Sequence, residues 1–159
     1  MVGLVSRSLM VVVGAALTAA PALAEPQRPA PSVSLTQEQI LRLTPDQLED
    51  YFSPAYHRCM KTGDAAQGVT AGMMDCLGLE NDRQDAALNA AYKRALARQD
   101  RAGQANLRVS QRAWLKQRDP ICVRSMGDQK GGSMGGLIYS GCILQEQVRR
   151  KLWLNANRP

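Results

Sequence analysis

The sequence has few of the residues on which most catalytic and metal sites depend. It has a single histidine, His57, and no two of its four cysteines form a close CxxC pair. Zinc sites typically use such pairs or several histidines, and a Cys–His catalytic pair requires a free thiol near a histidine. P-loop, GxGxxG, HExxH and GxSxG motifs are also missing from the sequence. We therefore predict a non-enzymatic protein that uses neither a metal ion nor a cofactor.

The sequence also lacks an apolar run of the length that a membrane-spanning helix needs, which is about 20 residues. Its N-terminal apolar run over residues 9–17, LMVVVGAAL, is followed closely by the charge of Glu25. Arg7 precedes this run and Ala22-Leu23-Ala24 follows it, which is the pattern of an export signal. We predict a signal peptide over residues 1–24, cleaved near Ala24–Glu25, and a periplasmic or secreted protein. A retained N-terminal anchor is the alternative.

The rest of the chain divides into a short lead-in and one domain. Residues 25–34 contain three prolines in a polar stretch, which is typical of a flexible or polyproline-like segment. Residues 35–159 suit a single domain. No useful length of this segment alternates between apolar and polar residues as a strand would. We predict an all-α fold, a small disulfide-stapled domain of about four to five antiparallel helices, one of them long.

Two short helices have clear start signals. Thr44 stands as an N-cap before Pro45, with Gln47 at the third helical position, which is a capping box. Ser53 and Pro54 repeat this start signal. Three longer helices are predicted over residues 70–99 with Thr70 as N-cap, 104–118, and 137–155.

The predicted long helix has one face on which apolar and polar residues are mixed. Asn81 and Asp85 fall on this face, and we predict that they form a hydrogen-bonded lock with Arg112 or Arg118 of the next long helix. The face is formed at three- and four-residue steps by Met74, Leu77, Asn81, Asp85, Leu88, Tyr92, Ala95 and Leu96.

The stretch SQRAWLKQRDPIC, residues 110–122, combines a tryptophan with basic residues. At helical spacing, Trp114 and Leu115 point away from the basic side chains, so we predict that they pack in the core, with the stem of Arg118 beside the indole. Asp119 and Pro120 are predicted to end the helix. The opposite face carries the basic residues Arg108, Arg112 and Lys116.

Charge is divided unevenly along the chain. Residues 36–92 carry 4 basic and 9 acidic residues, whereas residues 93–130 carry 10 basic and 3 acidic residues. The basic zone is either a solvated helix face or a surface for an anionic partner. Because the chain is predicted to be exported, nucleic acid is not expected, and anionic lipids or acidic polymers of the envelope are the predicted partners.

The four cysteines form an even set in a protein predicted to be exported, which indicates two disulfides. Sequence alone allows three connectivities. The segments CMKTGDAAQG and CVRSMGDQKGG share one design, a helix end followed by a Gly-Asp loop. This likeness favours two separate helical hairpins, stapled by Cys59–Cys76 and Cys122–Cys142.

These residues together resemble the lysozyme inhibitor LprI-like N-terminal domain family. The resemblance covers about residues 56–152 and implies a small exported helical domain of the bacterial envelope, with a lysozyme or muramidase as partner. It rests on Cys59, Thr70, Met74, Cys76, Glu80, the segment DAALNAAY over 85–92, Leu107, SQRAWLKQRDPIC over 110–122, a glycine-rich loop, Cys142, Arg149 and Leu152.

The glycine-rich loop over residues 127–136 is the candidate inhibitory segment. A protein inhibitor of lysozyme usually places a polar or cationic group between the two catalytic carboxylates of the enzyme. Lys130 or Ser133 would supply that group here, and an ordinary connecting loop is the alternative. Because many animal lysozymes are strongly basic, the basic zone would repel them. Either the acidic residues 36–92 then face the enzyme, or the target is a different one.

Overall fold

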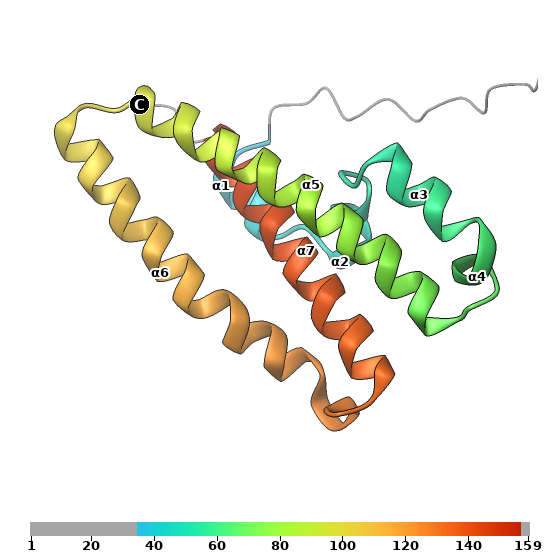
Figure 1. Cartoon of the computed structure of the whole chain (residues 1–159). Helices are drawn as coiled ribbons and strands as arrows, with labels where there is room; N and C mark the ends of the chain where they lie inside the picture. Colours follow the sequence, from blue (N-terminus) through green and yellow to red (C-terminus); the bar gives the residue numbers. More distant parts are fainter. Residues whose placement is uncertain (1–34, 157–159) are drawn as a thin grey trace, which may run out of the picture.

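The computed structural model describes residues 35–156, and within this range it contains α-helices, one 3₁₀ helix and no strand (Figure 1). The predicted signal peptide and lead-in, residues 1–34, lie outside the described residues, as do residues 157–159. The helices are α1 (Gln37–Leu41), α2 (Pro45–Glu49), α3 (Pro54–Met60), α4 (Gly63–Ala66), α5 (Thr70–Ala97), α6 (Arg101–Ser125), η1 (Gly127–Gln129) and α7 (Ser133–Ala156).

The all-α prediction is confirmed, but the number and kind of helices differ from the prediction. Three helices are long, and α1 to α4 are short. Helices α1 and α4 were not predicted. Helix α1 has a capping box at Thr36 and Gln39 of the kind that marks α2, whereas α4 has only 4 residues and no side-chain cap. No helix in the described part of the chain is both long and apolar enough to cross a membrane.

Helix α7 is the central element of the fold. It packs along α5 over the longest interface of the structure, and its other side contacts α6, whereas α5 and α6 touch little beyond their connection. Figure 1 shows α6 diverging from α5 with α7 between them. Helices α1 and α2 lie against α7, and α3 and α4 lie against α5. One long side of α6 is therefore left without a neighbouring helix.

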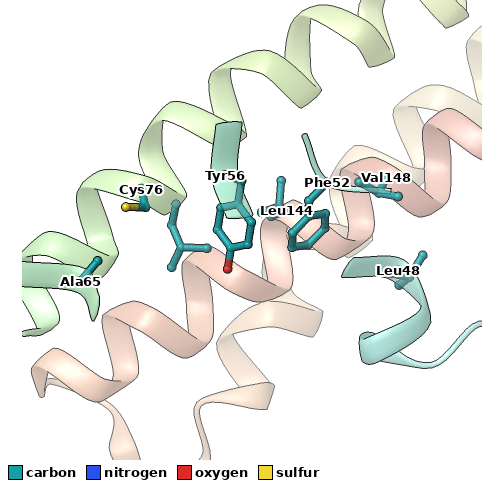
Figure 2. Packing of buried hydrophobic residues seen from close by; sticks show 8 residues of the cluster. Leu48, Phe52, Tyr56, Ala65, Cys76, Leu144 and Val148 are labelled. Atoms are coloured by element: carbon teal, nitrogen blue, oxygen red, sulfur yellow. The ribbon is translucent and has the colours of Figure 1, made fainter. Parts of the chain in front are cut away.

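Two apolar clusters fill the core. In the first, Phe52 and Tyr56 meet edge to face with ring centroids 5.1 Å apart, and Leu48, Leu144 and Val148 surround them (Figure 2). The second cluster joins the three long helices farther along the bundle. It consists of Leu88, Ala91, Ala95, Leu107 and Leu154, with the partly buried Tyr92, Leu96, Trp114 and Trp153 packed against it.

Capping side chains start α1, α2 and α3, whereas α4 has none. Thr44 accepts a hydrogen bond from the amide of Gln47, whose side chain accepts one from the amide of Thr44, so the predicted capping box is present. Ser53 caps α3 in the predicted position. Thr70, by contrast, is the first residue of α5, and Val69 is its N-cap, without a side-chain hydrogen bond.

The prediction that Asp119 and Pro120 end the helix is wrong, because α6 continues to Ser125. Pro120 is exposed, so water can reach the Lys116 carbonyl that would otherwise accept from an amide at position 120. Two residues later, Cys122 is fully buried and disulfide-bonded to α7. The bond holds the last turns of α6 against α7 although one hydrogen bond of the helix is missing.

Candidate functional site

The tip of the α6–α7 hairpin is the most exposed well-anchored segment among the described residues. We call residues 127–132 the tip loop. Every residue from Gly127 to Met134 is exposed. Lys130 follows η1 directly and lies in the turn that leads to α7. The end of the hairpin therefore presents backbone, one cation, Lys130, and one carboxylate, Asp128, to solvent.

A disulfide closes the base of this hairpin. Cys122 of α6 and Cys142 of α7 are bonded, with their Cα atoms 5.4 Å apart. The second disulfide joins Cys59 of α3 to Cys76 of α5, with a Cα–Cα distance of 5.7 Å. These are the pairs that the sequence likeness favoured, and each staples its own hairpin. The tip loop thus extends from a covalently fixed base.

Glycines let the tip loop turn tightly. Gly127 and Gly131 have φ angles of 51° and 87°, in the region that favours glycine. The amide of Gln129 donates to the Met126 carbonyl at 2.9 Å, and the amide of Gly132 donates to the Gln129 carbonyl at 3.3 Å. A Cβ atom added at Gly135, in the first turn of α7, would lie 2.2 Å from the Gln129 carbonyl oxygen. The loop backbone therefore rests directly on α7.

We expect Gly135→Ala to lower the free energy of unfolding by about 1–3 kcal/mol, because the loop backbone must move away from the new methyl group. Gly141→Ala in the same helix is the matched control. A Cβ there meets nothing within 4 Å, so this change should be neutral or stabilise the helix by up to about 1 kcal/mol. Urea unfolding of both variants measures the difference, and equal stabilities would show that the loop does not rest on α7.

The structure places the two predicted inhibitory residues differently. Lys130 lies in the tip loop and is exposed. Ser133, predicted as a loop residue, is instead the first residue of α7, which starts four residues earlier than expected. Lys130 offers three hydrogen-bond donors on a flexible stem. It is therefore the better placed of the two for insertion into a cleft.

The predicted basic surface lies on α6 and is exposed. Arg108, Arg112 and Lys116 follow one another at one-turn spacing along the helix. Arg108 donates to the Gln104 side-chain carbonyl at 3.2 Å. The geometry therefore offers a row of cations to solvent, separate from the tip loop.

Trp114 lies on the opposite side of α6, against the second cluster. The Arg118 guanidinium is 5.4 Å from the indole centroid, and its Nε lies 2.7 Å from an Asp119 carboxylate oxygen. Asp119 thus pairs with Arg118 and does not end the helix. The prediction that Leu115 packs in the core is wrong, because Leu115 is 45% exposed.

A buried arginine that sequence analysis missed connects α6 to α7. Arg150 donates from Nε to the Gln111 side-chain oxygen at 2.9 Å and from Nη2 to the Ser110 hydroxyl at 3.0 Å. Its guanidinium lies 4.3 Å from the Trp153 ring centroid and 5.9 Å from that of Trp114. Burial lowers the pKa of Arg150 to about 10, and nearby Tyr92 opposes this shift. The stretch SQRAWLKQRDPIC thus serves packing on its inner face.

The predicted lock through Asp85 is wrong. Asp85 is exposed and accepts a hydrogen bond from the Asn89 side chain at 2.9 Å. Asn81 is half-buried and donates to the carbonyls of Leu77 and Ser140 at 3.0 and 3.4 Å. The buried face of α5 is rotated away from Asp85, so that Glu80 and Gln84 point into the protein.

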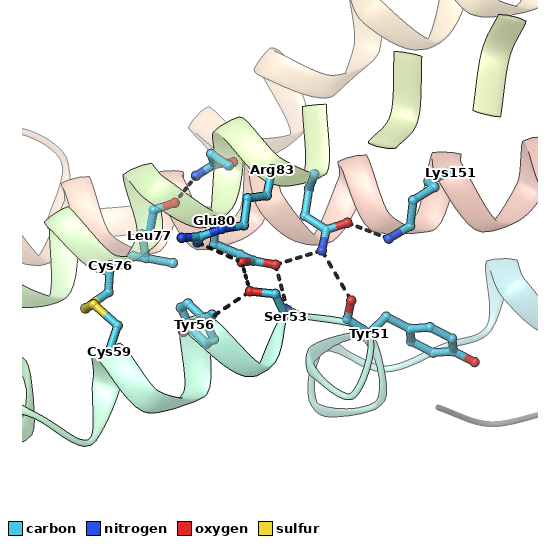
Figure 3. A network of polar contacts seen from close by, with 11 residues as sticks. Tyr51, Ser53, Tyr56, Cys59, Cys76, Leu77, Glu80, Arg83 and Lys151 are labelled. Carbon is cyan, nitrogen blue, oxygen red and sulfur yellow. Dashed lines mark hydrogen bonds and ion pairs between the residues drawn. A yellow bond between two sulfur atoms is a disulfide. The ribbon is translucent and has the colours of Figure 1, made fainter. Parts of the chain in front are cut away.

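Glu80 is the centre of a buried polar network (Figure 3). Its Oε1 accepts hydrogen bonds from the Ser53 amide at 2.8 Å and the Gln84 side chain at 2.7 Å. Its Oε2 accepts one from the Ser53 hydroxyl at 2.5 Å and lies 3.4 Å from Nη1 of Arg83. The same Ser53 hydroxyl accepts from the Tyr56 amide, so one side chain caps α3 and joins it to α5.

Gln84 extends this network to α7. Its amide nitrogen also donates to the Tyr51 carbonyl at 3.2 Å, and its side-chain oxygen accepts from Lys151 Nζ at 2.5 Å. Burial lowers the pKa of Lys151, while the negative charge of Glu80 opposes that shift. The network is therefore a structural bridge between three helices. Its sequence signal was the three- and four-residue spacing of Glu80 and Gln84 between Leu77 and Leu88.

The fold and the site define a class, a small disulfide-stapled helical domain with an anchored, protruding hairpin tip. The sequence matches the model of the lysozyme inhibitor LprI family over residues 59–154, and the chain belongs to this family. No curated protein and no solved structure gives a significant match. In residues 35–156, no group of three or more His, Cys, Asp or Glu side chains is arranged to hold a metal ion.

Proposed function

We propose that the protein inhibits a lysozyme by inserting the tip loop into the catalytic cleft of the enzyme. Membership of the lysozyme inhibitor LprI family supports the inhibitor role, and the disulfides are consistent with a location outside the cytoplasm. The observation that carries the choice of the tip loop is its combination of full exposure with a fixed base at Cys122–Cys142. A loop that is already ordered loses less entropy on binding.

The two catalytic carboxyl groups of a lysozyme favour a cation in the tip loop. Glycosidases of this kind use two carboxyl groups on either side of the scissile bond, about 5–10 Å apart. The Lys130 ammonium, with three donors, could bond one or both carboxyl groups in that space. A buried charge-assisted pair would also stop the enzyme from holding one carboxyl group protonated as its general acid.

The position of the tip also bears on the choice of target. The tip loop continues directly from α6, whose exposed side carries the row of cations. An approach tip-first brings that row towards the enzyme, so a strongly basic lysozyme would be repelled. We therefore propose that the target is a lysozyme without a strongly basic surface around its cleft.

Lys130→Ala is expected to weaken inhibition by at least about tenfold, because loss of one partner of a buried charged pair usually costs 2 kcal/mol or more in binding. Ser133→Ala should weaken it less. The measurement is a titration of the oxidised protein into assays of lysozymes of different types and net charges, with peptidoglycan turnover as readout.

Lys93→Ala is the matched control, since Lys93 is an exposed lysine on α5 away from the tip. It should leave inhibition unchanged. Equal inhibition by the Lys130 and Lys93 variants would reject the tip loop as the inhibitory segment. Lack of inhibition of every lysozyme tested would reject the proposed function and favour an accessory structural role.

A further inference from the structure

The side of α6 that faces away from α7 is a second exposed surface, and the inhibitor proposal gives it no binding role beyond the repulsion of strongly basic enzymes. We call it the outer face of α6 and define it by Arg108, Val109, Arg112, Lys116, Pro120 and Val123, all of which are exposed. Helix α6 contacts α7 and barely touches α5, so this face has no helix packed over it within residues 35–156 (Figure 1). The face belongs to a helix of 25 residues, which is about 37 Å long.

The charge of this helix is strongly one-sided. Asp119 is the single carboxylate residue in α6; its side chain is 51% exposed, and one of its carboxylate oxygens lies 2.7 Å from Nε of Arg118. Asp119 lies on the exposed arc of the helix, three residues after Lys116, so Arg108, Arg112 and Lys116 outnumber the carboxylates of this face by three to one. Such a row of positive charge attracts an anionic surface and loses that attraction as salt increases.

Apolar side chains are interleaved with these cations. Val109 is 57% exposed and Val123 is 39% exposed. In the C-terminal half of the same helix, a hollow of about 300 Å³ lies between Lys116, Gln117, Pro120, Ile121 and Arg124. Lys116 and Arg124 provide positive charge beside the apolar surfaces of Pro120 and Ile121. This arrangement matches a partner that is both anionic and partly apolar.

We propose that the outer face of α6 docks on the surface of an anionic phospholipid bilayer. A helix with cations around exposed apolar residues can lie in the interface plane, with its apolar side chains among the upper parts of the lipids. Phosphate headgroups would meet Arg108, Arg112 and Lys116, and the valines would gain by leaving water. A soluble acidic polymer satisfies the cations but offers nothing to the valines, so the apolar residues favour lipid.

The experiment is a sedimentation assay with vesicles, using the oxidised protein as purified from an exporting host. Vesicles of phosphatidylcholine with one third phosphatidylglycerol are compared with vesicles of phosphatidylcholine alone, at low and moderate salt. The test variant carries Arg108→Gln, Arg112→Gln and Lys116→Gln. Its matched control carries Arg58→Gln, Lys61→Gln and Lys93→Gln, which removes the same charge from exposed positions outside α6.

We expect binding to the anionic vesicles only, weakened by salt and reduced at least about tenfold in the test variant, since each cation near such a surface adds to the affinity. The control variant should bind nearly as well as the unchanged protein. A further variant, Val109→Ser with Val123→Ser, should also bind more weakly, because its apolar contact is lost while its charge is kept.

Two results would overturn the proposal. Binding to the anionic vesicles that is absent, or equal in the test and control variants, would show that the outer face is not the docking surface. Binding to soluble polyphosphate as strong as to vesicles, with no effect of the valine substitutions, would assign the face to an acidic polymer. Circular dichroism of each variant checks that its helices are intact.

Discussion

Replacement of Glu80 by alanine is expected to lower the free energy of unfolding by about 3 kcal/mol, the combined cost of leaving several buried donors without an acceptor. Glu80 is fully buried and accepts hydrogen bonds from the amide and hydroxyl of Ser53 and from the side chain of Gln84. None of these groups has an equally placed acceptor once the carboxylate is gone. Urea unfolding followed by circular dichroism measures the loss.

Glu38→Ala is the control for this prediction. Glu38 of α1 pairs at 2.6 Å with Arg42, the C-cap residue of the same helix, but both side chains are at least 75% exposed. Solvent screens such a pair, and its loss should change the stability by less than about 0.5 kcal/mol. A loss below about 1 kcal/mol in the Glu80 variant would mean that water replaces the carboxylate and that the network contributes little.

Local signals in the sequence were sufficient for the helix starts of α2 and α3. Thr44 and Ser53 cap their helices through neighbours three residues away, so the necessary information lies within one turn. The disulfide pairing could also be predicted, because each cysteine pair flanks one short connection between two helices. Both kinds of feature depend on contacts that are close in sequence.

The buried face of α5 depends on contacts that are distant in sequence. Glu80 and Gln84 follow the same helical spacing from Leu77 as Asn81 and Asp85 do, with a rotation of about one residue, or 100°. Which pair is buried is decided by Ser53 and Tyr51 on one side and by Lys151 on the other. A pattern in one helix cannot contain the positions of those partners.

The end of α6 also depends on contacts outside the helix itself. Proline is unfavourable in a helix interior as a local rule, and the rule gave a helix that ended at position 119. The structure continues the helix because the exposed position of Pro120 and the disulfide at Cys122 outweigh that local cost. The length of the tip loop was also predicted wrongly. Helix α7 begins at Ser133, so the loop is shorter than the glycine-rich segment 127–136 suggested.

Removal of the Cys122–Cys142 disulfide is expected to have the second large effect, on stability and on inhibition together. The bond closes a segment with a sequence separation of 20, and the change of both cysteines to alanine should cost about 3 kcal/mol in the chain-entropy model. We also expect inhibition to fall at least about tenfold, because the tip loop loses its fixed base and must be ordered on binding. Hydrogen exchange of the amides from Gly127 to Gly132 should become faster.

The double variant Cys59→Ala with Cys76→Ala separates the two effects. Its disulfide has a sequence separation of 17, so the expected loss of stability is again about 3 kcal/mol. This bond staples α3 to α5, however, and does not touch the tip loop. At a temperature where both variants are folded, only the Cys122–Cys142 variant should inhibit poorly. Equal inhibition by the two double variants would contradict this prediction. It would mean that inhibition does not depend on the Cys122–Cys142 disulfide, because the two variants have similar stability and only one of them lacks that bond.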